Sequence, residues 1–144
     1  MSRTVSTVDP AVRVVDETLF TQDRTALLGS RCRDCAAYTF PRQGGCPRCT
    51  GADMADVPLS RTGTLWTWTV QGFRPKPPYT GTEAYEPFGV GYVELPGQLL
   101  VETRLTETDP DKLAIGMPMD LALVPFRDGP DGPVYTFAFV AVAP

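Results

Sequence analysis

All four cysteines of this 144-residue chain lie in two C-x-x-C pairs, Cys32 with Cys35 and Cys46 with Cys49, and ten residues separate the pairs. Two residues between cysteines allow a tight turn that aims both sulfurs at one point. Two such turns that face each other form a tetrahedral tetrathiolate site, which is the geometry of structural zinc. Four protein ligands leave the metal without an open position, so we expect zinc to hold the fold together and to take no part in catalysis.

Three other interpretations of the cysteines are open at this level. Two disulfides need an oxidising compartment, and the N-terminal sequence M-S-R-T-V-S-T-V-D-P lacks the apolar core of an export signal. A rubredoxin-like iron site uses similar turns, normally with a longer spacer. A thioredoxin-like redox pair needs only one C-x-x-C, set in a βαβ unit. We predict structural zinc bound by all four cysteines.

The residues around the cysteines predict the strands and turns of a zinc ribbon. The segment between the two pairs favours a short strand around Tyr38–Phe40 and a return through the Gly-Gly that follows. Residues 26–31 predict the first ribbon strand, and residues 51–56 are interpreted as a linker. This half of the chain is therefore expected to consist of an N-terminal arm with one short helical turn, residues 1–25, and a ribbon, residues 26–56.

Beyond the ribbon the apolar residues repeat with a period of two, which is typical of β-strands. Five strands are predicted, over residues 64–70, 88–95, 99–105, 119–125 and 134–142. A helical turn at residues 109–113 and a loop at residues 127–133 interrupt them. Five short antiparallel strands in about 85 residues favour a closed barrel, and the OB-fold has this count with its helix at the same point. The predicted fold class is mainly β, with a rubredoxin-like zinc ribbon before a five-stranded OB-fold barrel over residues 57–144; an open sandwich is the alternative.

Two tryptophans on the first barrel strand are candidates for a ligand surface. The alternation T-L-W-T-W-T-V puts Trp66 and Trp68 on one face and Leu65 on the other. Such rings could stack on an adenine or line an acyl path. A strand face of this kind is more often barrel core, which is our interpretation.

The connection between the first two barrel strands, residues 71–87, is far longer than the usual ~2–5 residues of a hairpin. Its prolines restrict the backbone, and the first loop of an OB-fold commonly binds the ligand. A disordered insertion is the alternative. We predict a binding loop, with these candidate contact residues: Phe73, Arg74, Lys76, Tyr79 and Tyr85.

Charge and composition narrow the classes of function. The net charge is −4, which argues against a protein that binds a phosphate backbone. Histidine is absent, so histidine-based nucleophile activation and acid–base catalysis are excluded. Residues 31–50 hold four arginines against one aspartate, and these arginines either balance the thiolates or bind an anion. No apolar run approaches the ~20 residues of a membrane span, and we expect a cytoplasmic protein.

The order of motifs resembles a known family. It runs R-C-R-D-C, F-P-R, C-P-R-C, S-R-T-G-T-L-W-T-W-T-V, P-F-G-V-G-Y-V-E-L and I-G-M-P-M. Over residues 19–142 the chain is similar to the zinc-ribbon/OB-fold family of acyl-CoA-associated accessory proteins, although its helical segment before the ribbon is shorter than in many members. The paired cysteine turns are the most specific part of this likeness.

The resemblance implies a partner. Members accompany thiolase-fold enzymes or enoyl-CoA hydratases, so the chain is expected to be a non-catalytic subunit of a hetero-oligomer. It would be a required component of an acyl-CoA thiolase-like or aldolase complex, with acyl-CoA at or near the interface and the 71–87 loop as a CoA or partner contact. General likeness to members linked to steroid side-chain degradation implies a retro-aldolase partner and a place in lipid metabolism.

Two further hypotheses belong to other classes. Zinc ribbons and OB-folds both occur in nucleic-acid-binding modules, but the acidic barrel lacks the basic groove that such binding needs. An enzyme acting alone would draw its bases from Glu83, Glu86, Glu94 or Glu102 and its acids from Tyr79, Tyr85 or Tyr92. Nothing in the sequence pairs these groups at a telling spacing.

Overall fold

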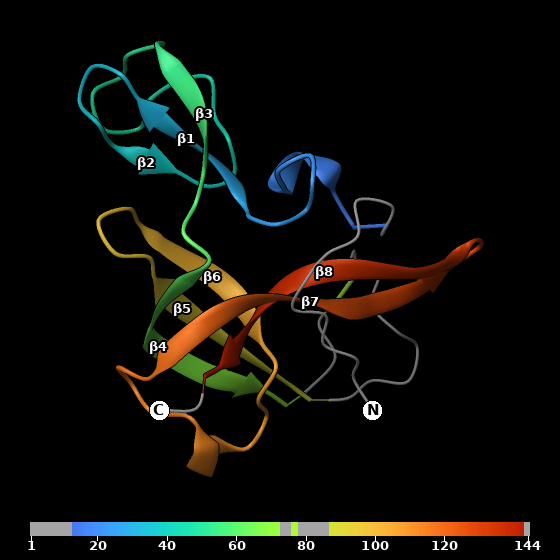
Figure 1. Ribbon diagram of the computed structural model, residues 1–144. Helices are drawn as coiled ribbons and strands as arrows, with labels where there is room; N and C mark the ends of the chain where they lie inside the picture. Colours follow the sequence, from blue (N-terminus) through green and yellow to red (C-terminus); the bar gives the residue numbers. More distant parts are fainter. Residues whose placement is uncertain (1–12, 73–75, 78–86, 143–144) are drawn as a thin grey trace.

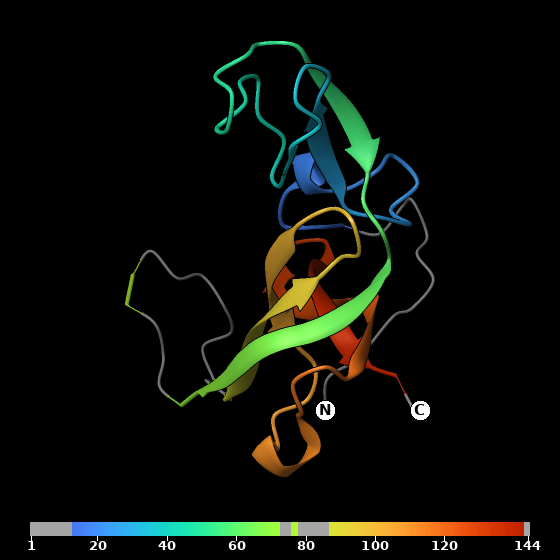
Figure 2. The same ribbon diagram turned by 90° about the vertical axis from the view of Figure 1, so that its left-hand side faces the viewer.

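A small three-stranded sheet and a closed five-stranded barrel follow one another along the chain (Figure 1). The structure, a computed structural model, describes residues 13–72, 76–77 and 87–142. The sheet stands at one end of the barrel, and the loop that carries the second short helix lies at the other end (Figures 1 and 2). The predicted fold class, mainly β with an N-terminal ribbon and a barrel, is confirmed.

The ribbon sheet has the order β2-β1-β3. Its strands are β1 (Leu28–Cys32), β2 (Tyr38–Thr39) and β3 (Met54–Pro58), all antiparallel to their neighbours. β1 leads directly into the first cysteine, and β2 follows the first cysteine pair, as the sequence predicted. The interpretation of residues 51–56 as a linker is wrong, because Met54 pairs with Cys32 at the start of a five-residue ladder. The second cysteine turn reverses the chain, so the residues after it lie beside β1 and complete the sheet.

Five strands close the barrel in the order β4-β5-β6-β8-β7. They are β4 (Thr62–Gln71), β5 (Phe88–Glu94), β6 (Leu100–Leu105), β7 (Pro118–Gly129) and β8 (Gly132–Ala141). β6 and β8 run parallel, and the pairing of β4 with β7 closes the ring. The 3-10 helix η2 (Pro110–Lys112) lies between β6 and β7. This is the OB-fold topology, and the closure excludes an open sandwich.

The last two strands are longer than predicted. The loop expected at residues 127–133 is paired strand, with Arg127 opposite Val134 and Gly129 opposite Gly132. Gly132 has a φ of +119°, which glycine adopts without a steric penalty, so two residues suffice for the turn. The resulting β7–β8 hairpin projects beyond the barrel (Figure 1).

One hydrophobic core joins the ribbon to the barrel. Leu27, just before β1, is fully buried with Leu65 and Phe139 of the barrel. The ring of Phe137 on β8 meets Phe40 of the ribbon edge-on, with the ring centres 5.6 Å apart. Each fully buried side chain of this size contributes about 1.5–3 kcal/mol. Packing of this kind fixes how the ribbon sits on the barrel.

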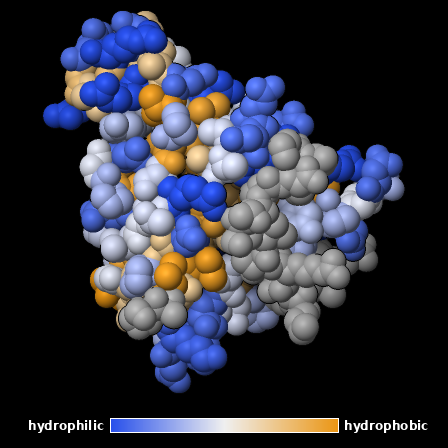
Figure 3. Space-filling view, in the orientation of Figure 1, coloured by the Kyte–Doolittle hydropathy of each residue, from blue (hydrophilic) through white to orange (hydrophobic). Residues whose placement is uncertain are grey.

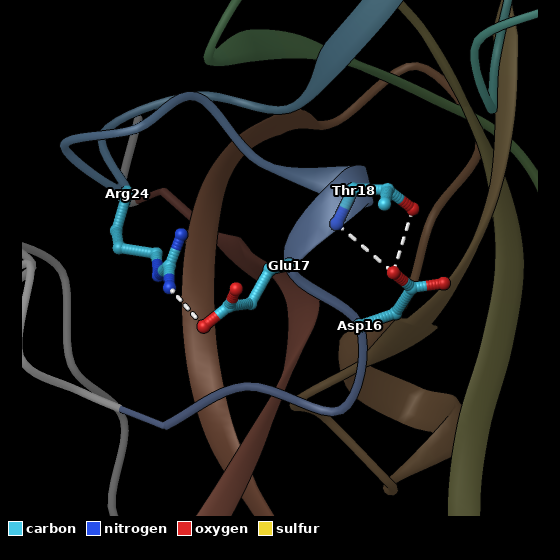
Figure 4. A network of polar contacts seen from close by, with 4 residues as sticks. All are labelled: Asp16, Glu17, Thr18 and Arg24. Carbon is cyan, nitrogen blue, oxygen red and sulfur yellow. Dashed lines mark hydrogen bonds and ion pairs between the residues drawn. The ribbon is translucent and has the colours of Figure 1, made fainter.

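The segment before the ribbon is also docked. The 3-10 helix η1 (Glu17–Leu19) begins at Asp16, whose Oδ1 accepts the Thr18 amide at 2.9 Å and the Thr18 hydroxyl at 2.6 Å (Figure 4). The hydroxyl bond lowers the pKa of Asp16. Arg24 forms an ion pair with Glu17 at 3.2 Å. The amide of Val15 bonds to β8. The described part of the predicted arm therefore contacts the barrel, and residues 1–12 lie outside the described residues.

Candidate functional site

The first cysteine pair lies on a closed backbone turn. The amide of Ala36 donates to the carbonyl of Cys32 at 2.9 Å, and the amide of Cys32 donates to the carbonyl of Ala37 at 2.8 Å. Ala36 has a φ of +66°, the left-handed conformation that reverses the chain after the second cysteine. The turn thereby points the sulfurs of Cys32 and Cys35 the same way.

The second pair repeats this turn bond for bond. Thr50 donates to Cys46 at 2.9 Å, and Cys46 donates to Gly51 at 2.8 Å. Thr50 has a φ of +62°, close to that of its counterpart in the first turn. Two turns of the same construction, facing each other, are what a tetrathiolate site requires.

The four sulfur atoms lie within 4.8 Å of one another. Cys32 and Cys49 are 3.5 Å apart at sulfur, and Cys35 and Cys46 are 3.6 Å apart. Disulfide-bonded sulfurs would be about 2.05 Å apart, so the cysteines are not paired as disulfides. Four sulfurs at about 2.3 Å from a tetrahedral zinc ion would be about 3.8 Å apart, which the observed spacing matches. The donor set is one that zinc prefers.

The electrostatics of the site favour a bound cation. The amides of Cys49 and Arg48 both donate to the Cys46 sulfur at 3.4 Å, and the Cys49 amide contributes most to lowering the pKa of Cys46 to about 7. The Gly51 amide lowers the pKa of Cys49, but the three neighbouring thiols and burial together raise that pKa to about 12. Sulfurs this close cannot all ionise unless a positive charge lies among them.

Two of the four ribbon arginines are engaged beside the site. Arg33 forms an ion pair with Asp53 at 2.6 Å, and Arg42 forms one with Asp56 of β3 at 2.8 Å. Exposed pairs of this kind contribute about 0–1 kcal/mol each. Both guanidinium groups therefore already have a carboxylate partner.

The predicted CoA- or partner-binding residues fall almost entirely outside the described part of the chain. Lys76 is described and is exposed to solvent. The other four lie outside the described residues: Phe73, Arg74, Tyr79 and Tyr85. Their role stays a prediction.

The two tryptophans do not share a face. The register of β4 against β5 shifts between Leu65 and Thr67, so a β-bulge breaks the expected alternation. Trp68 packs partly buried against the core, whereas Trp66 is 52% exposed. The interpretation of Trp66 as barrel core is wrong. Its ring instead meets that of Tyr92 edge-on, with the centres 6.2 Å apart.

Sequence reasoning also missed a groove of about 490 Å³ between the ribbon and the outer face of the barrel. Its lining includes Phe40 of the ribbon, Phe88 of β5 and Phe126 of the β7–β8 hairpin. The Arg104 guanidinium lies 3.9 Å from the centre of the Phe88 ring and 5.4 Å from that of Phe126. The sequence signal for this groove was the alternation F-G-V-G-Y-V in β5. It puts the larger residues on one face of the strand and the glycines on the other.

One pair of the acid–base candidates is brought together. The Tyr92 hydroxyl lies 3.4 Å from a carboxylate oxygen of Glu102, its cross-strand neighbour on β6. Both groups are exposed, and the bond is long, so the pair is a surface contact and not an acid–base site.

Within the described residues, no helix is long and apolar enough to cross a membrane.

Comparison with known proteins agrees with this geometry. Residues 23–55 match a family described as ChsH2, rubredoxin-like zinc ribbon domain, and residues 56–124 match one described as ChsH2, C-terminal OB-fold domain. The benzoylsuccinyl-CoA thiolase subunit BbsA of Thauera aromatica is 30% identical over 115 residues, which cover 78% of this chain and 74% of that protein. A DUF35 domain-containing scaffold protein of Methanocaldococcus jannaschii is 24% identical over 119 residues, 82% of each chain.

A solved structure has a similar fold over most of the chain. The Ltp2-ChsH2(DUF35) aldolase superposes with a TM-score of 0.62 and 28% sequence identity, over 82% of this chain and 86% of that chain. The predicted zinc-ribbon/OB-fold architecture and its structural zinc are thus confirmed.

Proposed function

This chain belongs to the ChsH2 family of zinc-ribbon and OB-fold proteins, and from that membership we propose that it is a non-catalytic accessory subunit of a thiolase-superfamily enzyme that acts on acyl-CoA thioesters. One observation carries the proposal. A relative that is 30% identical over about three quarters of both chains is a thiolase subunit. The likeness to a chain of the Ltp2-ChsH2(DUF35) aldolase supports the same class of partner.

The side chains available here support an accessory role. Thioester and carbon–carbon bond chemistry usually needs an activated nucleophile and a base. Histidine is absent from the sequence, and all four cysteines point at a single metal site. A closed tetrathiolate site offers no open position to a substrate. The chemistry therefore belongs to the partner.

What this chain supplies is a stiff body. Zinc ties the two cysteine turns together, and the shared core ties the ribbon to the barrel. Such a body shapes or bridges the CoA-ester site of its partner and stabilises it. Contacts to CoA or the partner are proposed for the 71–87 loop, through Phe73, Arg74, Lys76, Tyr79 and Tyr85.

The proposal also covers the cellular compartment and the reaction of the partner. A reducing cytoplasm keeps the thiolates available to zinc. A retro-aldolase is the finer candidate for the partner, because a similar structure is an aldolase. We propose steroid side-chain breakdown as its pathway from the likeness of the sequence motifs alone.

Purification from the native source through a tag on this chain tests the proposal. We expect a thiolase-superfamily enzyme to co-elute at fixed stoichiometry in size-exclusion chromatography and to be identified by mass spectrometry. The chain alone should not turn over acyl-CoA. A chain that stays alone on the column, or that turns over acyl-CoA by itself, would contradict the proposal.

The two lysines of the chain provide a test variant and a control for the role of the 71–87 loop. Lys76 lies in the 71–87 loop, and Lys112 lies on η2 at the far end of the barrel from the ribbon; both are exposed. We expect Lys76→Gln to weaken the complex or its affinity for CoA esters and Lys112→Gln to leave both unchanged. Equal behaviour of the two variants would remove Lys76 from the interface.

A further inference from the structure

Strand β5 carries its larger side chains on the outside of the barrel. The outward positions hold Phe88, Val90 and Tyr92, and the alternate positions are buried. Those buried positions begin with two glycines, Gly89 and Gly91, where an added Cβ would lie 2.5 and 2.6 Å from a backbone carbonyl oxygen. The interior therefore has no room for a side chain at either position. The larger residues of β5 therefore have to face outward, where they are available for contacts outside the barrel core.

Neighbouring strands extend this apolar surface. Trp66 on β4 is 52% exposed, Tyr92 is 39% exposed and Leu100 on β6 is 38% exposed. The rings of Trp66 and Tyr92 are in edge-to-face contact, and Leu100 lies diagonally across the β5–β6 ladder from Tyr92. We call these three residues the aromatic stripe. Single exposed apolar residues are normal, but a contiguous set across three strands marks an interaction surface.

The stripe continues into the groove described above. Leu100 belongs to the stripe and also lines the groove, whose floor includes Val90. One wall comes from the ribbon, through Phe40 and Pro41, and the other from the hairpin, through Phe126 and Phe137. Hydrophobic atoms gather where the ribbon meets the barrel (Figure 3). A volume of about 490 Å³ accepts several apolar side chains.

Charged residues of both signs lie among the apolar ones. Arg104 lies across from Val90, and its guanidinium stacks on the Phe88 ring. Glu102, opposite Tyr92, also lines the groove, and Glu94 lies opposite Leu100 beside the β5–β6 turn. Trp, Tyr and Arg are the residue types that most often carry interface energy.

We propose that the aromatic stripe and the groove form the docking surface for the thiolase-type partner, and that the docked segment places apolar side chains in the groove and a basic group towards Glu94 and Glu102. The inference rests on the proposed function and assigns its interface. An apolar centre with charged residues that complement the partner at its rim is the usual construction of such an interface.

Affinity measurements with the co-purified thiolase-superfamily enzyme test the surface. We expect Trp66→Ser and Leu100→Ser each to raise Kd at least tenfold, and Arg104→Glu to do the same. Ile115→Ser is the matched control, because Ile115 is 72% exposed and lies between η2 and β7, away from the stripe. It should leave Kd unchanged. Zinc content and the thermal midpoint of each variant report whether it is folded.

The possible outcomes distinguish a wrong docking surface from a wrong proposed function. If the wild-type chain binds the enzyme and all three variants bind equally well, the docking surface is wrong while the proposed function stands. If the wild-type chain binds no thiolase-superfamily enzyme, both fail. If the chain alone forms a dimer that Trp66→Ser dissociates, with partner affinity unchanged, the stripe is a contact between copies and the inference is overturned.

Discussion

Replacement of Gly91 by alanine should destabilise the barrel by about 3 kcal/mol, at the upper end of the cost of overpacking. The new Cβ would lie 2.6 Å from the carbonyl oxygen of Thr67 and 3.1 and 3.2 Å from methyl groups of Leu105 and Leu65. Ordinary contacts begin at 3.4 Å, so β4 and β5 would have to separate by about 0.8 Å. A shift of that size stretches ladder hydrogen bonds beyond their normal length.

Urea denaturation, followed by circular dichroism, measures the effect. Gly72→Ala is the control, because nothing lies within 4 Å of its added Cβ and the loss of unfolded-state freedom makes that change neutral or stabilising by about 0.4–1 kcal/mol. A Gly91→Ala variant as stable as Gly72→Ala would show that the barrel interior has room. The large residues of β5 would then have no steric reason to face outward.

Three other results are expected. Cys46→Ser, or zinc removal by a chelator, should unfold the ribbon, since metal binding supplies on the order of ten kcal/mol to isolated zinc modules; metal-free protein with intact ribbon signals in NMR would contradict this. Thr50→Gly and Ala36→Gly should each raise the thermal midpoint, because a left-handed conformation costs a non-glycine residue about 1 kcal/mol; lower midpoints would show that the side chains matter more than the backbone. The carboxyl of Asp23 should titrate with a pKa of about 2 in NMR, because the hydroxyl of Thr21 donates to it, as do the hydroxyl and amide of Thr25. Its contribution to stability is present above its ordinary pKa of 3.8 and is lost as the pH falls through 2, so titration near 3.8 would refute the contact.

The metal site could be predicted from the sequence because its information is local. The two-residue spacing fixes each turn. The structure has the same backbone hydrogen bond in both turns, from Ala36 to Cys32 and from Thr50 to Cys46. The barrel strands were also predictable, because an alternating pattern needs only neighbouring residues.

Long-range pairing accounts for what was missed. The chain at Met54 becomes a strand only because the second cysteine turn brings it beside Cys32. Trp66 points outward because of a bulge against β5, which no count along β4 reveals. Alternation in β5 separated two faces but did not say which one faces inward. The close approach of the Thr67 carbonyl to Gly91 decides that, and it belongs to the fold rather than to the strand.

The rate of the partner's acyl-CoA reaction, measured with and without this chain, is the most direct test of an accessory role. The partner alone should be slow or inactive, and an equimolar amount of the wild-type chain should raise its rate at least tenfold, about 1.4 kcal/mol. Cys46→Ser should fail to do so, because its ribbon no longer holds its shape. A partner that works equally well alone, or a purified chain that turns over acyl-CoA without it, would contradict the assignment.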